Sequence, residues 1–535
     1  MKTMINSIIL ASCLALPLAS CSDSDAAPEQ KDWSTTTYFN SSDAAAQDTY
    51  YKPAVGYVGD PMPFFDPVAG DFKVLYLQDF RPNPEGTYHP IWGVSTKDAA
   101  HYTALGELVS CGTLKSQDAA IGTGSTIYDE ASKLYYTFYT GNKYKPTGDE
   151  SAQAVMVATS ADFKTWTKDR TFLLKGQDFG YDKNDFRDPF VFKGDDGKFH
   201  MLISTKKGGK GSLAEFVSDD LKNWTDNGVF MTMMWDRFYE CPDLFKMGDY
   251  WYLVYSEIHH AVRRVQYFKG RTLDELKACT ANDAARWPDA HEGFLDSRGL
   301  YAGKTASDGT NRYLWGWCPT RSGKDNTAVG ASPAEPEWAG NLVCYKLIQH
   351  EDGTLTLGQI DAVSEKYNQD VAVEVKESQN MTEADGTYTL AGSVEQPDAY
   401  MLMGRLGSHN KISFTVTTSN QWDKFGISMV RGSDSKKYYT MVVNPENENN
   451  RKVNFEEQGV EGKGFIAGID GYVFARPADN VYNVTIYTDN SICVMYINDV
   501  CSYTNRIYGI QKNCWSINSY NGANVKISNL KISQY

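Results

Sequence analysis

Hydrophobic and polar positions alternate in short runs along this chain, and one hairpin-like pattern recurs through its first two thirds. Each copy has an apolar residue, a turn rich in Asp, Gly and Lys, and then an alternating strand rich in aromatic residues. Five copies occur, at 65–72, 128–135, 192–199, 245–252 and 307–313. Because a period of two is typical of half-buried strands, each copy predicts one antiparallel unit.

A second motif follows the first in three of these units. It combines Ser, Asp and an aromatic residue, at 95–102, 160–166 and 218–224. Two motifs that interleave at a period of roughly sixty residues are typical of a β-propeller with four-stranded blades. We therefore expect a five-bladed propeller over residues 50–368. Helical periodicity is scarce and is expected only at 273–285.

The repeat stops near Val371, and short alternating strands separated by Gly, Asn and Asp continue to Tyr535. The strands are expected at 382–392, 411–431, 437–443, 483–497 and 525–532. Such a series is typical of an antiparallel β-sandwich, which we expect over residues 369–535. The predicted fold class is all-β: a five-bladed β-propeller followed by a C-terminal β-sandwich.

The first residues have the charged start and short apolar run of a secretory signal, too short for a convincing membrane span. The run ends in Leu18-Ala19-Ser20-Cys21, which resembles the lipobox of bacterial lipoproteins. This resemblance implies a signal peptide over 1–21, lipidation of Cys21 and a linker over 22–49. The acidic residues 22–25 resemble an export tag of Bacteroidetes surface lipoproteins. An ordinary signal with an unrelated cysteine is the alternative.

The composition narrows the range of ligands. A net charge of -15 argues against nucleic acid, whose phosphates require a basic face. With 13% aromatic residues, the chain is suited to a neutral polymer held by aromatic and carboxylate side chains. Beyond Cys13 and Cys21 the cysteines form no CxxC pair and no His-flanked cluster, so no metal site and no cofactor are expected. A disulfide near Cys493 and Cys501 remains open.

Three short segments each place one carboxylate beside a proline, just before one of the predicted hairpins. They contain Asp60 (57–61), Asp188 (186–189) and Glu240 (239–242). In a propeller the first strand of every blade lines the central channel, so we expect the three carboxylates to converge in one axial pocket. Hydrolysis of a glycosidic bond needs two carboxyl groups around an oxocarbenium-like transition state. The three segments therefore predict a glycosidase site.

These segments resemble the three motifs of glycoside hydrolase family 32, which contains invertases, inulinases and levanases. The resemblance implies a retaining enzyme in which Asp60 is the nucleophile, Glu240 is the acid and base, and Asp188 stabilises the transition state. It implies that Arg187 holds Asp188 and sugar hydroxyls. Further matching residues, expected to bind substrate with Arg187, are Gln78, Trp92, Ser125 and Trp317. Trp92, Trp317 and Trp338 are expected either to stack on sugars or to be buried within blades.

One departure from the family pattern changes the expected substrate. The family usually has Trp-Met-Asn-Asp-Pro-Asn-Gly, whereas this chain has Tyr57-Val58-Gly59-Asp60-Pro61-Met62-Pro63. The asparagine that normally helps to seat a terminal fructose is absent, which fits a more open cleft for internal units. The pattern and the lipoprotein signal together resemble surface endo-levanases of gut Bacteroidetes.

The resemblance therefore implies endo-cleavage of levan (β-2,6) at the cell surface by a protein that is lipid-anchored to the outer membrane, or alternatively periplasmic. The expected partners are fructan and outer-membrane glycan-uptake proteins, with no nucleic acid and with membrane contact through the lipid only. Three alternatives remain. They are an exo-acting fructanase or inulinase, an inverting enzyme like those of family 43, and a non-catalytic surface glycan-binding propeller.

Overall fold

The computed structural model describes residues 49–233, 238–257, 264–279, 293–321, 336–431, 438–445, 452–458, 472–474, 476–511 and 513–535. The expected signal peptide with Cys21, the linker up to residue 48 and the end of the expected helix (280–285) lie outside these residues. The described part of that helix is α1 (Leu273–Ala278). None of the described helices is long and apolar enough to cross a membrane.

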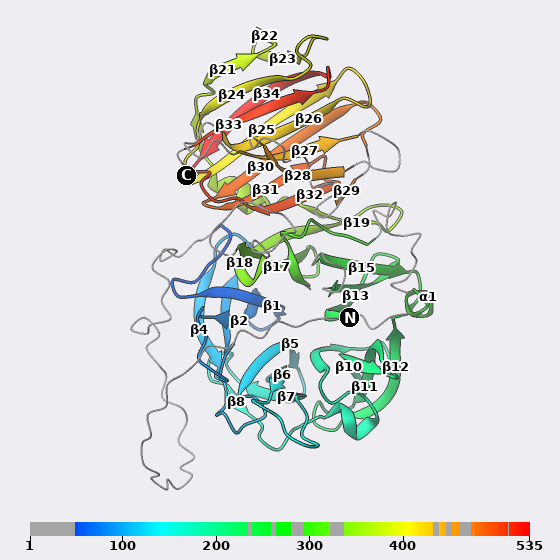
Figure 1. Ribbon diagram of the computed structural model, residues 1–535. Helices are drawn as coiled ribbons and strands as arrows, with labels where there is room; N and C mark the ends of the chain where they lie inside the picture. The colour runs from blue at the N-terminus through cyan, green and yellow to red at the C-terminus, as the bar shows by residue number, and fades with distance from the viewer. Residues whose placement is uncertain are drawn as a thin grey trace. The chain divides into compact units, whose positions relative to one another are not determined.

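The first part of the chain forms five antiparallel blades (Figure 1). Blade 1 contains β1 (Tyr57–Asp66), β2 (Asp71–Asp79), β3 (Ile91–Thr96) and β4 (Thr103–Val109). Blade 2 contains β5 (Ala120–Asp129), β6 (Leu134–Asn142), β7 (Gln153–Ser160) and β8 (Thr167–Lys168). Blade 3 contains β9 (Phe186–Lys193), β10 (Phe199–Lys207), β11 (Lys210–Ser218) and β12 (Thr225–Thr232).

Blade 4 has three described strands: β13 (Glu240–Met247), β14 (Tyr250–Glu257) and β15 (Arg264–Gly270). Blade 5 contains β16 (Tyr301–Ser307), β17 (Arg312–Arg321), β18 (Pro336–Gln349) and β19 (Leu355–Gly358). Blades 5 and 1 join through a pairing of β18 with β1, at Val58 and Gly340. The first strands of neighbouring blades contact one another in the order β1, β5, β9, β13, β16 and back to β1. They form the inner wall of the propeller.

The two repeated motifs each close a turn. The first supplies the hairpin between strands one and two of a blade, as between β9 and β10, where the N–H of Gly194 donates to the carbonyl of Lys198. The second follows strand three, where Asp162 Oδ1 accepts from the N–H groups of Lys164 and Thr165, both at 2.8 Å. Because each motif encodes a local turn, the number of copies gave the number of blades correctly.

The C-terminal part is a sandwich of two antiparallel sheets (Figure 1). One sheet contains β22 (Met381–Ala384), β23 (Thr387–Ala391), β34 (Asn524–Gln534), β25 (His409–Thr418), β30 (Val481–Asp489), β31 (Ile492–Ile497) and β32 (Cys501–Arg506), with β20 (Gln369–Val371) on β34. The other contains β21 (Val375–Gln379), β24 (Ala399–Arg405), β33 (Cys514–Tyr520), β26 (Lys424–Arg431), β27 (Tyr438–Asn444), β28 (Lys452–Gln458) and β29 (Tyr472–Val473). Helix α3 (Asp361–Lys366) precedes the sandwich. The predicted fold class is confirmed.

Buried apolar side chains from both sheets form one core inside the sandwich, which includes Phe414, Met441 and Trp515. The disulfide left open by the sequence is absent, because Cys493 and Cys501 are both free. Cys493 lies opposite Asn505 in the pairing of β31 with β32, whereas Cys501 lies opposite Ile497. The two thiols are therefore held apart by the strand register.

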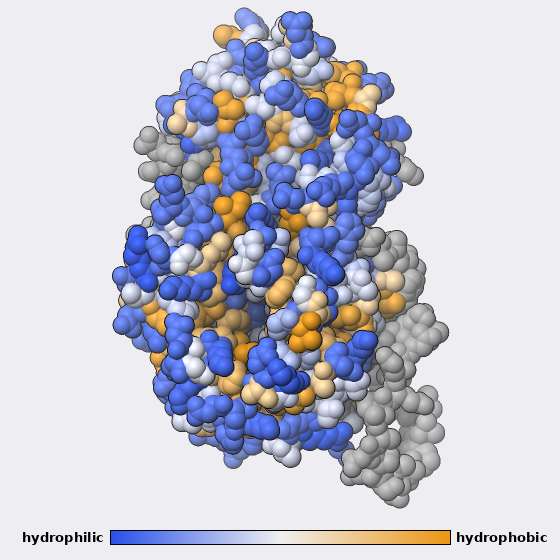
Figure 2. Space-filling model, turned by 180° about the vertical axis from the view of Figure 1, so that it is seen from behind, coloured by the Kyte–Doolittle hydropathy of each residue, from blue (hydrophilic) through white to orange (hydrophobic). Residues whose placement is uncertain are grey.

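A buried cation contributes to the contact between the sandwich and blade 5. The guanidinium of Arg506 on β32 donates to the carbonyls of Pro319 and Cys318 and to Asn341 Oδ1, at 2.9, 2.8 and 2.7 Å. The face of the molecule in Figure 2 is largely hydrophilic, with apolar side chains in small groups. This surface agrees with a mean hydropathy of -0.46.

Candidate active site

A β-bulge interrupts the first strand of every blade at about the same depth. The ladder register shifts after Gly59 in β1, Gly122 in β5, Glu240 in β13 and Tyr301 in β16, and β9 has the equivalent shift after Arg187. In four blades the next residue has a positive φ without being glycine: Asp60 (26°), Asp188 (57°), Cys241 (51°) and Ala302 (52°). Bulges and such strained residues re-aim side chains and are typical of functional sites.

The five bulges define two sets of equivalent residues around the propeller axis. The pre-bulge positions are Gly59, Gly122, Arg187, Glu240 and Tyr301. The bulge positions that follow them are Asp60, Thr123, Asp188, Cys241 and Ala302. Contacts between blades occur within each set: Thr123 with Asp60 and Cys241 with Asp188, and Arg187 and Tyr301 with Glu240. Asp60, Asp188 and Glu240 interact electrostatically, so the three carboxyl groups lie close together, as the sequence predicted.

Asp60 accepts two hydrogen bonds from uncharged donors. The hydroxyl of Thr123 donates to Oδ2 at 2.7 Å, and the indole N–H of Trp317 donates to Oδ1 at 2.9 Å. Burial raises the pKa of Asp60, and the negative charge of Glu240 raises it further, while the two donors lower it. Both donors favour the ionised carboxylate and hold its two oxygens in fixed directions.

Asp188 is 4% exposed, and its Oδ2 accepts from the backbone N–H of Cys241 at 2.9 Å. Its own N–H donates to Thr140 Oγ1 at 2.9 Å, which ties β9 to β6. Burial raises the pKa of Asp188 to about 6; the charge of Arg187 opposes this rise and that of Glu240 adds to it. Asp188 therefore changes its charge in the weakly acidic range.

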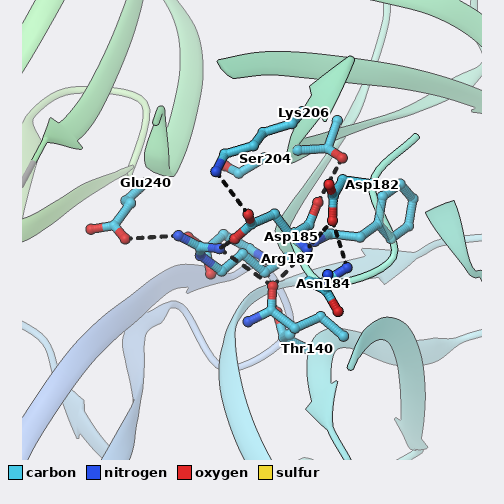
Figure 3. Close-up of polar contacts among 12 residues, drawn as sticks. Thr140, Asp182, Asn184, Asp185, Arg187, Ser204, Lys206 and Glu240 are labelled. Atoms are coloured by element: carbon cyan, nitrogen blue, oxygen red, sulfur yellow. Dashed lines mark hydrogen bonds and ion pairs between the residues drawn. The ribbon is translucent and has the colours of Figure 1, made fainter. Parts of the chain in front are cut away.

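Glu240 is bonded at both of its oxygens. Arg187 Nη2 donates to Oε1 at 3.0 Å, and the hydroxyl of Tyr301 donates to Oε2. The other guanidinium nitrogen of Arg187 donates to Asp185 Oδ1 at 2.7 Å, so this cation lies between two carboxylates (Figure 3). The aromatic ring of Phe238 lies 3.9 Å from the guanidinium carbon. Three adjacent pre-bulge residues thus form one chain of contacts.

The expectation that Arg187 holds Asp188 is corrected by these contacts. Within the described residues, the hydrogen bonds of the Arg187 guanidinium go to Asp185, Gln153 and Glu240. Asp188 accepts instead from the backbone N–H of Cys241. Arg187 acts on Asp188 through its charge.

The other expected substrate-binding residues lie in different environments. Trp317 is fully buried and is bonded to Asp60, so it has no free face for a sugar. Ser125 Oγ donates to the carbonyl of Pro189 and accepts from the N–H of Val191, both at 2.9 Å, which links β5 to β9. Gln78 is fully buried; its Nε2 donates to the carbonyl of Val55 at 2.6 Å, and its Oε1 has no hydrogen-bond partner among the described residues. The half-buried Trp92 lies on β3, outside the inner wall, and packs against Phe80.

Sequence reasoning missed Thr123, Tyr301 and Lys304. Lys304 is 2% exposed and donates from Nζ to the carbonyl of Gly124 at 3.0 Å. Burial lowers its pKa, and the negative charges of Asp243, Asp188 and Asp60 oppose that fall. Tyr301 and Lys304 occupy the same positions in β16 as Glu240 and Asp243 in β13. The repeat therefore relates these residues, but the equivalence becomes visible only once the position of the bulge is known.

Cys241 lies at a bulge position but is not suited to act as a nucleophile. It is 2% exposed, and burial raises the pKa of its thiol well above the usual value. The thiol therefore stays protonated. No group of His, Cys, Asp and Glu within the described part of the chain is arranged to hold a metal ion. The chemistry of the site rests on two carboxyl groups in different surroundings, an arrangement that supports nucleophilic and acid–base steps.

Two family models match the chain. The model described as "Glycosyl hydrolases family 32 N-terminal domain" matches residues 50–360. The model described as "GH32, BT1760-like, C-terminal domain" matches residues 353–532. The first match contains all five described blades together with Asp60, Asp188 and Glu240.

Curated relatives match over shorter stretches. The "Beta-fructofuranosidase, insoluble isoenzyme CWINV2" of Arabidopsis thaliana is 25% identical over 320 residues, which covers 54% of this chain and 51% of that relative. The "Fructan 6-exohydrolase" of Beta vulgaris is 25% identical over 171 residues, which covers 29% of this chain and 27% of that relative. The chain thus spans about half the length of the first of these relatives, and less of the second.

Solved structures match over most of the chain. A sucrose-6-phosphate hydrolase from Lactobacillus gasseri has a TM-score of 0.66 at 18% identity, with 93% of this chain and 94% of that chain covered. An exo-inulinase from Aspergillus awamori has a TM-score of 0.66 at 16% identity, with 91% and 98% covered. At these identities the likeness shows the shared fold alone.

Proposed function

The chain belongs to glycosyl hydrolase family 32, and from that membership and the axial carboxylates we propose that it hydrolyses β-fructosyl linkages with retention of configuration. Asp60 is the nucleophile, Glu240 the general acid and base, and Asp188 the transition-state stabiliser. The observation that carries this proposal is the meeting of three carboxyl groups at the inner wall of the propeller. Asp60 accepts from Thr123 and Trp317, Asp188 from the N–H of Cys241, and Glu240 from Arg187 and Tyr301. A retaining glycosidase needs two such carboxyl groups, one as nucleophile and one as acid and base.

The first step forms a bond between a carboxylate oxygen of Asp60 and the anomeric carbon of the fructosyl unit. The bond from that carbon to the bridging oxygen breaks, and Glu240 gives its proton to the leaving oxygen. In the second step Glu240 takes a proton from water, the water oxygen bonds to the anomeric carbon, and Asp60 leaves as a carboxylate. Thr123 and Trp317 favour the ionised form of Asp60 and fix the directions of its oxygens before the first step.

Asp188 contributes charge. With a pKa of about 6 it is a carboxylate at neutral pH, and it lies beside the bulge that carries Glu240 because it accepts from the N–H of Cys241. A fixed negative charge next to the reacting sugar stabilises the positive charge that develops on the ring. The backbone bond to Cys241 holds this charge in place, so it needs no reorganisation during the reaction.

We further propose that the substrate is levan and that cleavage occurs within the chain. Support comes from Gly59, which leaves the position before the nucleophile without a hydrogen-bonding side chain. The partial match to a protein named fructan 6-exohydrolase and the BT1760-like C-terminal match are consistent with a fructan substrate. Exo-cleavage of levan or inulin is the alternative.

For location we propose the outer-membrane surface, with a lipid on Cys21 as the anchor and glycan-uptake proteins as partners. The support is the sequence pattern of residues 18–25. Protease treatment of intact cells should remove the protein from the surface, and Cys21→Ala should release it from the membrane fraction. Protection from the protease in intact cells would indicate a periplasmic protein instead.

The test of the activity is chromatography of early products after the purified protein has been incubated with levan and, separately, with inulin. A ladder of oligosaccharides from levan is the expected result, and fructose alone would establish exo-cleavage. Asp60→Asn and Glu240→Gln should each reduce hydrolysis by about 10⁴-fold or more, as expected for loss of a nucleophile or an acid. Activity near that of the wild type in either variant would overturn the assignment.

The two variants also discriminate between the roles. Glu240→Gln should retain activity on an activated fructoside, whose leaving group needs no proton, whereas Asp60→Asn should not. Binding of levan without release of any product from the wild type would instead select the glycan-binding alternative.

A further inference from the structure

Asp296 is a buried carboxylate that is held mainly by the sandwich. It is 1% exposed. The N–H of Thr504 donates to its Oδ1 at 2.8 Å, and the Thr504 hydroxyl donates to its Oδ2 at 2.7 Å. The hydroxyl of Ser502 donates to Oδ2 at 2.9 Å, and the N–H of Ser297 donates to Oδ1 at 2.6 Å. Among the described residues, three of these four donor groups therefore lie on β32 of the sandwich, although Asp296 itself precedes β16 of the propeller.

The hydrogen bonds around Asp296 continue into blade 5. The Thr504 hydroxyl also bonds the Tyr345 hydroxyl of β18, with 2.5 Å between the two oxygens. Because the Thr504 hydroxyl has one proton and gives it to Asp296, Tyr345 is the donor to Thr504. Burial raises the pKa of Asp296, and the hydroxyl and amide donors lower it. A buried polar group with satisfied hydrogen bonds is held rigidly.

The chain that follows Asp296 lies directly on the backbone of β32. Ser297 Oγ donates to the carbonyl of Thr504 at 2.5 Å and accepts from the N–H of Gly299 at 3.0 Å. A Cβ atom built on Gly299 would lie 2.0 Å from the carbonyl oxygen of Thr504. The φ angle of Gly299 lies outside the left-handed region, so glycine serves the close approach alone. Residues 296–299 are therefore fixed against the sandwich.

This segment leads into Tyr301, which contacts the proposed acid and base. Tyr301 is the first residue of β16, and its hydroxyl donates to Glu240 Oε2. The ladder register shifts between Tyr301 and Lys304, so regular pairing does not continue directly beyond Tyr301. On its other side stands Leu300, which is fully buried and donates from its N–H to the carbonyl of Ser297 at 3.3 Å. The position of the phenol thus depends on residues 296–300.

We infer that Asp296 is a positioning residue for the acid–base step: it holds residues 296–300 on β32 of the sandwich and thereby sets the Tyr301 hydroxyl against Glu240. This inference rests on the proposed function and deepens it, because it makes the sandwich part of the acid–base machinery. The phenol fixes one oxygen of Glu240, and with it the direction in which the carboxyl group meets the leaving oxygen. Misplacement of such a group by about 1 Å can cost about 100-fold in rate.

The test compares two substrates whose leaving groups differ. Asp296→Ala should lower kcat/KM for levan oligosaccharides by about 30-fold or more, because the acid is misplaced. For an activated fructoside, whose leaving group needs no proton, kcat/KM should fall by less than about threefold. Asp296→Asn should keep kcat/KM within about threefold on both substrates. Its carbonyl can accept from the two backbone N–H groups, and its amide can donate to the two hydroxyls.

A double variant and a matched control separate this role from general destabilisation. Tyr301→Phe removes the phenol directly, so in Asp296→Ala/Tyr301→Phe the two losses should not multiply. The control is Asp489→Ala. Asp489 is another fully buried carboxylate of the sandwich, and it accepts from the N–H of Tyr50 in the propeller at 3.1 Å. Its loss should lower the unfolding temperature without changing the ratio of kcat/KM between the two substrates.

Thr504→Val decides the question if Asp296→Ala does not fold. It removes one hydroxyl donor to Asp296 but keeps the backbone N–H and the size of the side chain, and it should show the same selective loss at about 5-fold or more. Equal losses of kcat/KM on the two substrates, or multiplicative losses in the double variant, would overturn the inference.

Crystal structures of the variants measure the distance between the Tyr301 hydroxyl and Glu240 Oε2 independently of activity. If the wild type hydrolyses neither fructan nor the activated fructoside, the proposed function fails. The positioning role then stands only if this distance grows in Asp296→Ala or Thr504→Val and stays unchanged in Asp489→Ala. A distance that stays unchanged in all three variants would overturn it.

Discussion

Arg187 and Glu240 form an ion pair across two neighbouring blades, with 3.0 Å between Nη2 and Oε1. Arg187 comes from the bulge of β9 and Glu240 from the bulge of β13, so the pair exists only when the two inner strands adopt the same irregularity. Because Asp185 binds the other end of the guanidinium at 2.7 Å, the cation is held in one orientation (Figure 3). The direction of Glu240 is therefore set by a fork that only arginine provides.

Arg187→Lys should lower kcat/KM by about 100-fold, because a single ammonium cannot bridge Asp185 and Glu240 with fixed geometry. Steady-state kinetics on levan oligosaccharides measures the effect. The control is Lys206→Met, which removes another cation at 3.1 Å from Asp185 without touching Glu240. It should change kcat/KM by less than about threefold, within the range of a surface ion pair. Equal losses of kcat/KM in the two variants would contradict the idea that the Arg187 guanidinium orients Glu240.

Trp317→Phe should shift the acid limb of the kcat/KM profile to higher pH by about one unit. The change deletes a donor to the Asp60 carboxylate, and a hydrogen bond to a charged group contributes about 1.5–3 kcal/mol. Loss of a donor that favours the ionised form raises the pKa of Asp60 further above its usual value.

Trp315→Phe is the matched control for Trp317→Phe. It removes a buried indole N–H two residues away on β17, which donates to the Tyr102 hydroxyl at 3.2 Å. Its acid limb should stay in place. A shift of equal size in both variants would show that the loss of packing, and not of the hydrogen bond, is responsible.

Lys304→Met should also move the acid limb upward in pH, because it removes a buried positive charge. The titratable groups that act on this lysine come from β1, β9 and β13: Asp60, Asp188, Cys241 and Asp243. Removal of the cation makes ionisation of Asp60 and Asp188 less favourable, so the pKa of each rises. The pH dependence of kcat/KM measures the shift.

Arg312→Met tests whether this effect depends on position. Arg312 is a half-buried cation; it donates to Thr305 Oγ1 at 2.8 Å and acts electrostatically on Asp243. Its removal should leave the acid limb within about 0.3 pH units of the wild type, because its charge acts on Asp243 and is not among the main influences on Asp60. If Lys304→Met behaves in the same way, the lysine has only a packing role.

Asp188→Asn should make the fold more stable at neutral pH. The pKa of Asp188 is about 6 in the folded protein, above the usual value of 3.8. Its contribution to stability is therefore fully present below pH 3.8 and is lost as the pH rises through about 6. The difference corresponds to about 3 kcal/mol. Urea unfolding at pH 4, 5, 6 and 7 should show the advantage of Asp188→Asn growing over this range.

The control for this measurement is Asp219→Asn, whose side chain is 80% exposed. Its effect on the unfolding free energy should stay within about 0.5 kcal/mol at each pH, as is usual for surface substitutions. A pH-independent difference between wild type and Asp188→Asn would contradict the raised pKa. Hydrolysis by Asp188→Asn should fall at all pH values, since the variant lacks the stabilising charge.

The features of the fold that the sequence predicted correctly are encoded locally. Each blade contains a local hairpin motif, such as the turn that Gly194 closes with Lys198, so five copies of the motif predicted five blades. The carboxylates were found because each sits beside a proline before a hairpin, and a propeller brings equivalent positions together. Whether Cys493 and Cys501 form a disulfide depends on the register of β31 against β32, and the pattern of alternating residues does not specify that register.

The sequence by itself therefore determined the all-β architecture, the number of blades and the three axial carboxylates. Tertiary structure alone decided which groups hold them: Thr123 and Trp317 on Asp60, and Tyr301 on Glu240. The physical reason is the bulge. Alternation predicts which way a side chain faces in a regular strand, but a bulge inserts one residue and reverses that order. The hydrogen-bond partners of the carboxylates then come from other blades, and the spacing of these residues in the sequence does not indicate that they are in contact.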